Sequence, residues 1–369
     1  MAKVKDFLKS EIVLVVSFVL AVASMFVVLP NEEYINYIDF KTLALLFCLM
    51  AVVAGVSGLG VFDLCAKKLL NKTSSLKGLG LILSLLCFFS SMVITNDVAL
   101  ITFVPFTIVA LKMSSNQKAI IPLVAVETVA ANLGSMLTPI GNPQNLYLFS
   151  FFEMGAGEFI EAILPYAVLS LILVIVSSLV LGNGRINNSF GKSEKLVLDY
   201  KKLSVYAILF VISLLTVFRV IPYYITLALT VVCVLIFDKK TIKKVDYSLL
   251  LTFIFLFVFI GNLGEISVIN EFLQSIVKDN EVLVGIASSQ VFSNVPAALL
   301  LSGFTNKASD LLVGVNLGGL GTLIASMASL ISFKFIAKED VKTSKYIFVF
   351  TVINIVFLAA NLLLYIIIR

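Results

Sequence analysis

The sequence contains no histidine and no tryptophan, and it has only four cysteines. A chain without histidine cannot form the usual zinc site, a serine–histidine catalytic pair or a histidine proton relay. The cysteines, Cys48, Cys65, Cys87 and Cys233, stand apart among apolar residues with neither metal-ligand nor disulfide spacing, so we expect small packing residues. We therefore expect no cofactor and no histidine-dependent enzyme.

Charged residues are scarce as well. Only 13% of the residues are charged and 60% are hydrophobic, whereas about one quarter of a typical soluble domain is charged. Apolar runs recur along the whole chain, many of them long enough to cross a bilayer core of about 30 Å. No stretch between them is long enough for a soluble domain. We interpret residues 1–369 as one transmembrane domain of an all-α polytopic membrane protein.

The apolar runs predict about nine membrane crossings, two of which are broken by polar residues. Two further apolar segments, 79–111 and 282–304, have a polar centre, and we interpret them as re-entrant hairpins that enter and leave on one side. The predicted crossings are residues 12–29, 42–60, 120–152 (broken), 162–181, 203–220, 223–237, 247–263, 308–335 (broken) and 346–368.

The basic residues predict the orientation of these crossings. With a cytoplasmic N-terminus, 22 of the 27 lysines and arginines lie in cytoplasmic loops, as the positive-inside rule requires. The linker 182–202 is then cytoplasmic and the C-terminus external, in a cytoplasmic membrane. The net charge of +5 is thus an orientation signal rather than a sign of nucleic-acid binding. The five basic residues on the other face are Lys41, Arg219, Lys278, Lys307 and Arg369.

Two passages recur in the same order in both halves of the chain. "SSMVITNDVA" (residues 90–99) matches "SSQVFSNVPA" (288–297) at five of ten positions. "NLGSMLTPIGNPQNL" (132–146) matches "NLGGLGTLIASMASL" (316–330) at six of fifteen. Because five crossings separate the two hairpins, the second hairpin must enter from the opposite face. We therefore predict two inverted repeats, 12–181 and 203–369, joined by the linker.

The stretch "TPIGNP" breaks a helix inside the membrane, where no water is available to form hydrogen bonds with the freed backbone groups. Such breaks are tolerated only where they line a cavity or are buried in protein. Broken helices at matching positions of two inverted halves point to the binding site of a transporter. Half-helix N-termini at this depth offer N–H groups to an anion, and freed carbonyls can hold a cation. The rival interpretation, that the small polar residues only pack helices together, does not explain four breaks recurring in order.

Hydroxyl and amide side chains repeat with the same spacing at both hairpin tips and both breaks, and such hard oxygen ligands suit Na⁺. In the first repeat the candidate binding residues are Ser91, Thr95, Asn96, Asp97, Thr138, Gly141, Asn142 and Asn145. In the second repeat they are Ser289, Ser293, Asn294, Thr322, Ala325 and Ser326.

Asp97 and Glu127 are the acidic residues inside the hydrophobic segments. An intramembrane carboxylate is costly unless it is paired or hydrated, and it is a functional candidate by default. Asp97 stands at a hairpin tip, and Val295 occupies the matching position in the other half. That asymmetry predicts a single proton or cation role for Asp97. Glu127 fits equally well a protonated residue hydrogen-bonded between helices.

The passages "SSMVITNDVALITFVPF", "ANLGSMLTPIGNPQNLYLF" and "VGVNLGGLGTLIASMASL" resemble the ion transporter superfamily, which includes citrate transporters, sodium/dicarboxylate symporters, arsenite permeases and one class of sodium/proton antiporters. The resemblance covers nearly the whole chain and implies a homodimer with an elevator motion. It also implies two sodium sites, one at Ser91, Thr95, Asn96 and Gly141 and the other at Ser289, Ser293, Asn294 and Ala325.

The tips depart from the Ser-Asn-Thr signature of the dicarboxylate branch. They read Thr95-Asn96-Asp97 and Ser293-Asn294-Val295, and an ionised Asp97 repels a dicarboxylate. We predict a secondary transporter that moves a small anion, an organic acid or an inorganic oxyanion, coupled to Na⁺ or H⁺. The alternative is a metalloid (arsenite or antimonite) efflux permease or a sodium/proton antiporter. A hydrolase lacks a histidine base, and a passive channel does not need two inverted broken repeats.

Overall fold

The computed structural model describes residues 11–70, 73–186 and 198–369. Over these residues all regular elements are helices, and the only extended pairing is an isolated bridge between Ser75 and Arg185. Eight of the described helical segments are long and apolar enough to cross a membrane. The predicted all-α polytopic membrane fold is confirmed. Residues 187–197 of the predicted linker lie outside the described residues.

The predicted crossings correspond to helices in the structure. They are α2 (Ile12–Met25), α4 (Phe40–Gly58), α8 and α9 (Ile120–Ser135 and Pro143–Phe151), α10 (Ala156–Leu179), α11 (Tyr200–Val217), α12 (Tyr223–Phe237), α14 (Tyr247–Glu265), α18 and α19 (Ala308–Gly318 and Met327–Ile336) and α20 (Thr343–Ile368). The hairpins are α6 with α7 (Leu76–Ile94 and Asn96–Met113) and α16 with α17 (Glu281–Phe292 and Asn294–Ser302). Shorter helices are α3 (Tyr34–Tyr37), α5 (Val61–Leu70), η1 (Gln117–Ala119), α13 (Lys239–Ile242) and α15 (Ser267–Val277).

Several boundaries differ from their predictions by a few residues; for example, α10 begins at Ala156, whereas the predicted crossing begins at residue 162. Helix α2 ends at Met25, although the apolar run continues to Leu29. Pro30 follows that run, and a residue before proline is disfavoured in the helical conformation. The final apolar residues therefore leave the helix before the run is complete.

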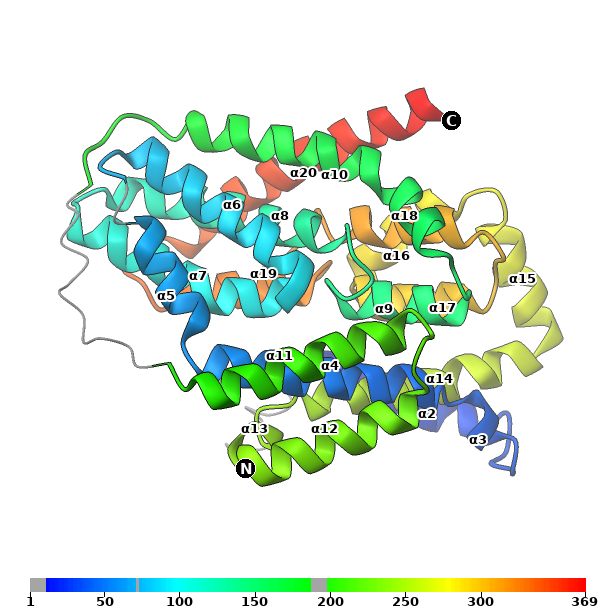
Figure 1. The fold of residues 1–369 in the computed structure, drawn as a ribbon. Coiled ribbons are helices and arrows are strands. Elements are labelled where there is room, and N and C mark those ends of the chain that lie inside the picture. Colours follow the sequence, from blue (N-terminus) through cyan, green and yellow to red (C-terminus); the bar gives the residue numbers. More distant parts are fainter. Residues whose placement is uncertain (1–10, 71–72, 187–197) are drawn as a thin grey trace, which may run out of the picture.

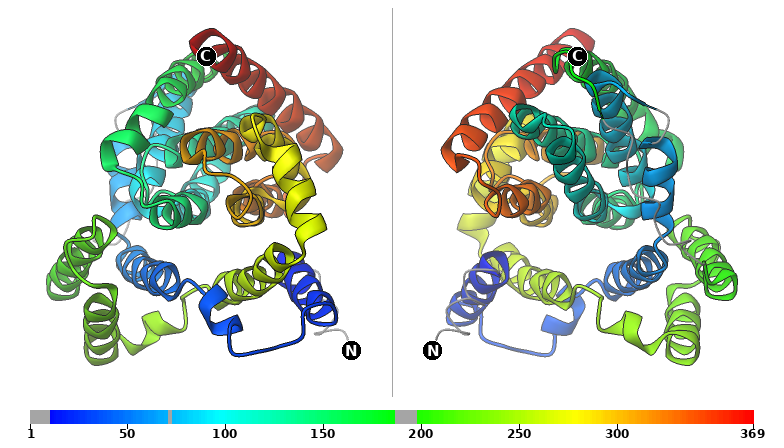
Figure 2. Two further views of the ribbon diagram at one scale, coloured as in Figure 1. Left: turned by 90° about the vertical axis from the view of Figure 1, so that its right-hand side faces the viewer. Right: turned by 90° about the vertical axis from the view of Figure 1, so that its left-hand side faces the viewer.

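The helices form two groups, which Figure 2 shows in end-on view. A hairpin bundle contains α6 to α10 and α16 to α20, with α6 packed on α8 and α16 packed on α18. A support layer contains α2, α4, α11, α12 and α14, in which α2 packs on α14 and α4 packs on α11 and α12. The two groups touch where α14 meets α17 and where α4 meets α9.

The two hairpins lie at opposite ends of the bundle, and their turns face each other near its middle (Figure 1). Helices α8 and α9 approach the middle from opposite ends, as do α18 and α19 (Figure 1). An amphipathic helix precedes each hairpin, α5 before the first and α15 before the second. The arrangement is therefore inverted between the halves, and the four polar breaks gather at one depth.

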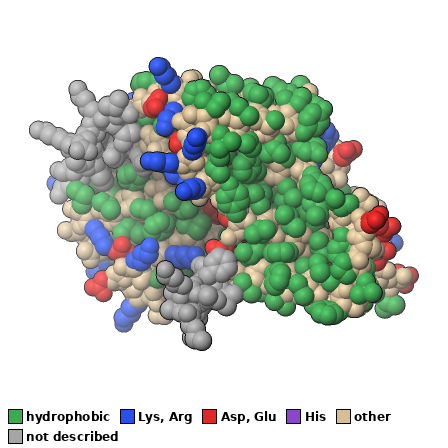
Figure 3. Space-filling model, turned by 90° about the horizontal axis from the view of Figure 1, so that it is seen from below, with side chains coloured by type: hydrophobic (Ala, Val, Ile, Leu, Met, Phe, Trp, Pro, Cys, Tyr) green, Lys and Arg blue, Asp and Glu red, His purple; other side chains and the backbone are tan. Residues whose placement is uncertain are grey.

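The outer surface of the support layer is largely apolar, as expected of a surface that meets lipid. Figure 3 shows this face, on which lysine and arginine side chains gather toward the end that carries the first hairpin. Long apolar side chains such as Ile208 and Val232 are 60% and 52% exposed. The fold thus places an apolar band beside a basic end.

Candidate functional site

The two hairpin tips share one uncommon backbone conformation. Thr95 has φ 72° and ψ 153°, and Ser293 has φ 73° and ψ 154°. This region of backbone space is essentially reserved for glycine, and a residue with a Cβ atom is strained there by about 1–3 kcal/mol. Two matched residues hold the same strain, and such strain clusters at ligand sites. Each tip ends one helix and starts the next without a loop between them.

The first break restarts its helix through a cap that the local sequence encodes. The Asn142 side chain accepts a hydrogen bond from the backbone N–H of Asn145 at 3.0 Å, and Pro143 occupies the first helical position. Asparagine and proline are the residues that favour these two positions. The stretch "GNPQN" therefore ends one half-helix and begins the next at a defined residue.

The freed carbonyls of the two breaks find different donors. In the first break the amide of Asn145 donates to the carbonyls of Ser135, Met136 and Thr138 at 3.3, 3.1 and 3.1 Å. In the second break the side-chain amide of Gln290, in hairpin helix α16, donates to the freed carbonyls.

The side-chain amide nitrogen of Gln290 donates to the carbonyls of Gly318 and Leu320, both at 2.9 Å, and its oxygen accepts from the N–H of Thr322 at 2.9 Å. The sequence prediction missed Gln290. Its signal was a glutamine where the first repeat has Met92. Side-chain amides thus satisfy several backbone groups at both breaks, which stabilises the unwound segments.

Two further asparagines, Asn132 and Asn316, connect the repeats, and the predicted site did not include them. The Asn132 side-chain oxygen accepts from the Asn96 amide at the first tip and from the Ser326 hydroxyl at the second break, both at 3.0 Å. The Asn316 oxygen accepts from the Asn142 amide at 3.2 Å. Each asparagine thus binds the break of the other repeat, at matching positions.

The Asn316 amide also donates to the side-chain oxygen of Asn145 at 2.7 Å. Both Asn132 and Asn316 are nearly fully buried, at 4% and 3% exposure. The signal for them in the sequence was their place as the first letter of the repeated "NLG". We call Asn132, Asn316 and their partners Asn96, Asn142, Asn145 and Ser326 the asparagine network.

A cavity of about 340 Å³ lies between the first hairpin tip and the support layer. Its polar wall contains Thr95, Asp97 and Asn142, and the connection between α13 and α14 contributes Lys244 and Asp246. An adjoining cavity of about 280 Å³ shares Leu249, Met327 and Ile331 with it and reaches Val295 and Pro296 at the start of α17. We call them the hairpin-tip cavity and the adjoining cavity.

Asp97 stands in the first turn of α7, and its backbone N–H donates to the Asn96 side-chain oxygen at 3.0 Å. One carboxyl oxygen of Asp97 is buried and has no hydrogen-bond partner among the described residues. A buried carboxyl oxygen without a partner is costly, and a proton or a cation bound there would offset that cost.

The sequence model of the citrate transporter family, CitMHS, matches residues 7–311. The chain belongs to this family. An uncharacterized transporter of Methanocaldococcus jannaschii is 36% identical over 330 residues, covering 88% of this chain and 89% of the archaeal protein. The inner membrane protein YbiR of Escherichia coli is 28% identical over 316 residues, covering 84% of each chain. The putative transporter arsB of Dictyostelium discoideum is 25% identical over 155 residues, 41% of this chain and 27% of that protein.

The residue set expected at the second sodium site of this citrate transporter family member is gathered at one place. The backbone N–H of Asn294 donates to the Ala325 carbonyl at 3.0 Å, and the Ser293 hydroxyl lies 3.5 Å from the same oxygen. Ser289 packs against Gly318, because a Cβ atom at Gly318 would lie 2.5 Å from the Ser289 hydroxyl oxygen. The set therefore surrounds the start of the second break.

The residue set expected at the first sodium site is arranged differently. No hydrogen bond joins Asn96 to Gly141 in the part of the chain that the structure describes. The Thr138 hydroxyl donates to the Met92 carbonyl at 2.5 Å and connects the first break to its hairpin in another way. At the matching position in the second break, the backbone N–H of Thr322 donates to the Gln290 side-chain oxygen. The two expected sites are thus not equivalent in geometry.

Gly134 and Gly318, at matching positions, let the broken helices approach their hairpins. A Cβ atom at Gly134 would lie 2.1 Å from the Phe88 carbonyl oxygen and 2.7 Å from the Ser91 hydroxyl oxygen. The Ser91 hydroxyl itself donates to the Phe88 carbonyl at 2.8 Å. Only glycine permits this approach, which brings Ser91 against α8.

We predict that Gly134→Ala destabilises the protein by about 1–3 kcal/mol, the usual penalty for overpacking, because the backbone carbonyl of Phe88 cannot withdraw as a side chain can. The melting temperature of the purified protein should fall by several degrees. Gly157→Ala is the matched control, since a Cβ atom there meets nothing within 4 Å. Equal melting temperatures of the two variants would contradict this packing.

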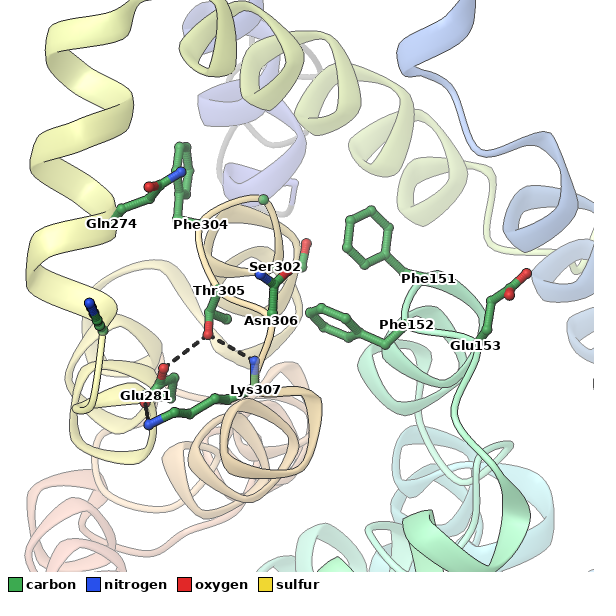
Figure 4. A pocket seen from close by; sticks show the side chains of 12 residues that line it. Phe151, Phe152, Glu153, Gln274, Glu281, Ser302, Phe304, Thr305, Asn306 and Lys307 are labelled. Atoms are coloured by element: carbon green, nitrogen blue, oxygen red, sulfur yellow. Dashed lines mark hydrogen bonds and ion pairs between the residues drawn. The ribbon is translucent and has the colours of Figure 1, made fainter.

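A cavity of about 850 Å³ lies at the base of the second hairpin, at the opposite end of the molecule from the base of the first. Figure 4 shows Glu281, Thr305 and Lys307 together on one wall and, on the other, Phe151 and Phe152 at the end of α9. The Thr305 hydroxyl donates to Glu281 at 3.0 Å, and Lys307 pairs with Glu281 at 3.8 Å. These bonds join the two ends of the hairpin. We call this space the opposite-face cavity.

Glu127 lies outside these cavities. Its side chain is fully buried in α8, one carboxyl oxygen is bonded to the Thr107 hydroxyl of α7, and the other has no partner among the described residues. The Thr107 hydroxyl also lies 3.3 Å from the Phe103 carbonyl. A neutral Glu127 can donate to Thr107, which then donates to that carbonyl, so this contact joins the hairpin to α8 and fits a structural role.

Proposed function

We propose that this member of the citrate transporter family is a secondary active transporter that moves a small anion, an organic acid or an inorganic oxyanion, coupled to Na⁺ or H⁺. One observation carries the proposal: the N-termini of four half-helices border the hairpin-tip cavity and the adjoining cavity. Thr95 and Asp97 mark the start of α7, Asn142 and Pro143 that of α9, Val295 that of α17 and Met327 that of α19. Each N-terminus carries a partial positive charge, which favours an anion.

The coupling cation is favoured by the C-terminal ends of the helices that precede the tips and the breaks. Helices α6, α8, α16 and α18 end near the same depth, so the negative ends of four helix dipoles lie there. The unpartnered oxygen of Asp97 adds a carboxyl group beside the first tip. A proton or Na⁺ at this depth offsets that charge and lets an anion occupy the cavity without repulsion.

Counterflow in proteoliposomes tests the proposal. Vesicles loaded with unlabelled citrate, succinate, phosphate or sulfate should accumulate the same labelled anion from outside, with a rate that depends on Na⁺ or pH. A carrier exchanges label against a gradient, whereas a channel equilibrates it. Absence of counterflow for every anion in the presence of both ions would contradict anion transport.

The second candidate is a metalloid efflux permease or a sodium/proton antiporter. Asp97 favours it, because an ionised carboxyl at the tip attracts a cation and repels a dicarboxylate. The similarity to a putative transporter arsB points the same way. Counterflow of arsenite, or Na⁺ movement against protons with no anion carried, would favour this candidate over the first.

We further propose that the protein is a homodimer in the cytoplasmic membrane, with its N-terminus and the linker 182–202 in the cytoplasm and its C-terminus outside. In intact cells, a membrane-impermeant thiol reagent should label Asn36→Cys and not Lys118→Cys, when the native cysteines have been replaced. Both positions are exposed and lie at opposite ends of the molecule. Labelling of Lys118→Cys alone would reverse the orientation.

A further inference from the structure

Lys244 is an unpaired cation on the wall of the hairpin-tip cavity. It lies in the connection between α13 and α14, and it borders the same space as Thr95, Asp97 and Asn142. Among the residues that the structure describes, its ammonium group forms no ion pair and no side-chain hydrogen bond, and the residue is exposed. The cation is therefore free to meet a ligand that enters the cavity.

The carboxylates nearest to Lys244 in the chain are already bound elsewhere. One Asp246 oxygen caps α14 by accepting from the backbone N–H of Leu249 at 3.0 Å. Asp238 pairs with Lys202 at 3.6 Å and lies 3.4 Å from the Tyr206 hydroxyl. Neither arrangement uses Lys244.

The end of α4 positions the ammonium group. Gly58 is the last residue of α4, and a Cβ atom at Gly58 would lie 2.8 Å from the Lys244 side-chain nitrogen. The C-terminal end of a helix carries a partial negative charge, which holds a cation nearby. Lys244 is thus held at the cavity wall without its charge being neutralised by a carboxylate.

Lys244 lies in the connection that leads from α13 into α14 of the support layer, whereas the hairpin tips belong to the bundle. The other charged groups that border the hairpin-tip cavity and the adjoining cavity are Asp97, Asp246, Glu11 and Lys334. Lys334 is on α19 and remains with the bundle. Lys244 is therefore a positive charge tied to one end of the molecule, and the opposite-face cavity has a different lining.

Resting on the proposed function, we propose that Lys244 is a specificity-determining residue that draws the anionic substrate into the hairpin-tip cavity from one membrane face only. A charged wall raises the local concentration of an oppositely charged ligand. Because Lys244 borders the cavity on one side of the molecule, it lowers the KM for the anion on that face and leaves the KM on the other face unchanged. A substitution cannot change the equilibrium of transport, so the same loss of kcat/KM appears on the other face as a lower kcat. The opposite face loads its substrate without help from this residue.

The test measures KM on each face in oriented proteoliposomes, with citrate, or with phosphate if the wild-type protein carries no citrate. We expect Lys244→Gln to raise KM by about tenfold on the face that carries α13, with kcat unchanged, and to weaken the dependence of KM on ionic strength. Lys244→Arg should keep the wild-type KM. Lys243→Gln is the matched control, since Lys243 is exposed and borders none of these cavities.

Gly58→Ala provides a second variant, because a methyl group there displaces the ammonium group without removing its charge. An intermediate rise in KM on the same face is expected. An unchanged KM for Lys244→Gln, or an equal rise on both faces, would overturn the inference while counterflow still supports anion transport. If the wild-type protein carries none of the anions in the counterflow panel, that result contradicts both the proposed function and this inference.

Discussion

Replacing Asp97 with asparagine is expected to reduce transport strongly, to uncouple it from Na⁺ or pH, and to leave the protein folded. The replacement keeps the shape of the side chain and removes its charge. In the structure one oxygen of Asp97 is buried without a partner, beside the first hairpin tip. We propose that this oxygen binds a proton or a sodium ion during transport, which would offset the cost of burying it.

Loss of a charged partner in a buried site costs about 1.5–3 kcal/mol, which corresponds to roughly 10- to 100-fold in affinity. We therefore expect Asp97→Asn to reduce transport by about that factor and to lose its dependence on Na⁺ or pH. The measurement is uptake against pH and Na⁺ concentration, beside a melting curve of the purified variant.

Asp310→Asn is the matched control. Asp310 also stands in the first turn of a helix, α18, but it lies at the outer end of the bundle and pairs with Arg369 at 3.5 Å. Its replacement should leave transport and ion dependence unchanged. If Asp97→Asn transports like the wild-type protein with the same ion dependence, Asp97 only stabilises the start of α7, a task that asparagine performs about as well.

Replacing Asn132 with leucine is expected to break the asparagine network and thereby to eliminate transport. Leucine has a similar size but offers no acceptor to the Asn96 amide or the Ser326 hydroxyl, which both lie 3.0 Å from the Asn132 oxygen. Each buried donor left without a partner costs about 1–3 kcal/mol. The first tip and the second break then lose their shared support, and the half-helix ends no longer face one cavity.

We expect Asn132→Leu to lower the melting temperature by several degrees and to remove measurable counterflow at temperatures where the variant is still folded. Asn316→Leu should behave alike, because it binds Asn142 and Asn145 of the other repeat. Asn361→Leu is the control: Asn361 is equally buried but bonds Ser170 far from the breaks. Transport by Asn132→Leu at the rate of Asn361→Leu would contradict a role for the network in positioning the site.

The candidate site was predicted in part from single-sequence patterns. The repeats located both tips and both breaks, because hydroxyls, asparagines, glycine and proline interrupt long apolar runs. The same reasoning missed Asn132, Asn316 and Gln290, which lie inside helices and interrupt nothing. A polar residue in the middle of a helix has no local signature that separates packing from network formation.

The sequence by itself determined that this protein is an all-α membrane protein, the order of its spans and hairpins, and where its helices break. These properties depend on hydropathy and on helix-breaking residues, which act over a few neighbouring positions. Only the tertiary structure decided which polar groups are partners. Asn132 and Ser326 are 194 positions apart in the chain and yet share a hydrogen bond. Likewise, Lys244 and Asp97 border one cavity only because the support layer packs against the bundle, and pairings of this kind depend on helix packing rather than on local pattern.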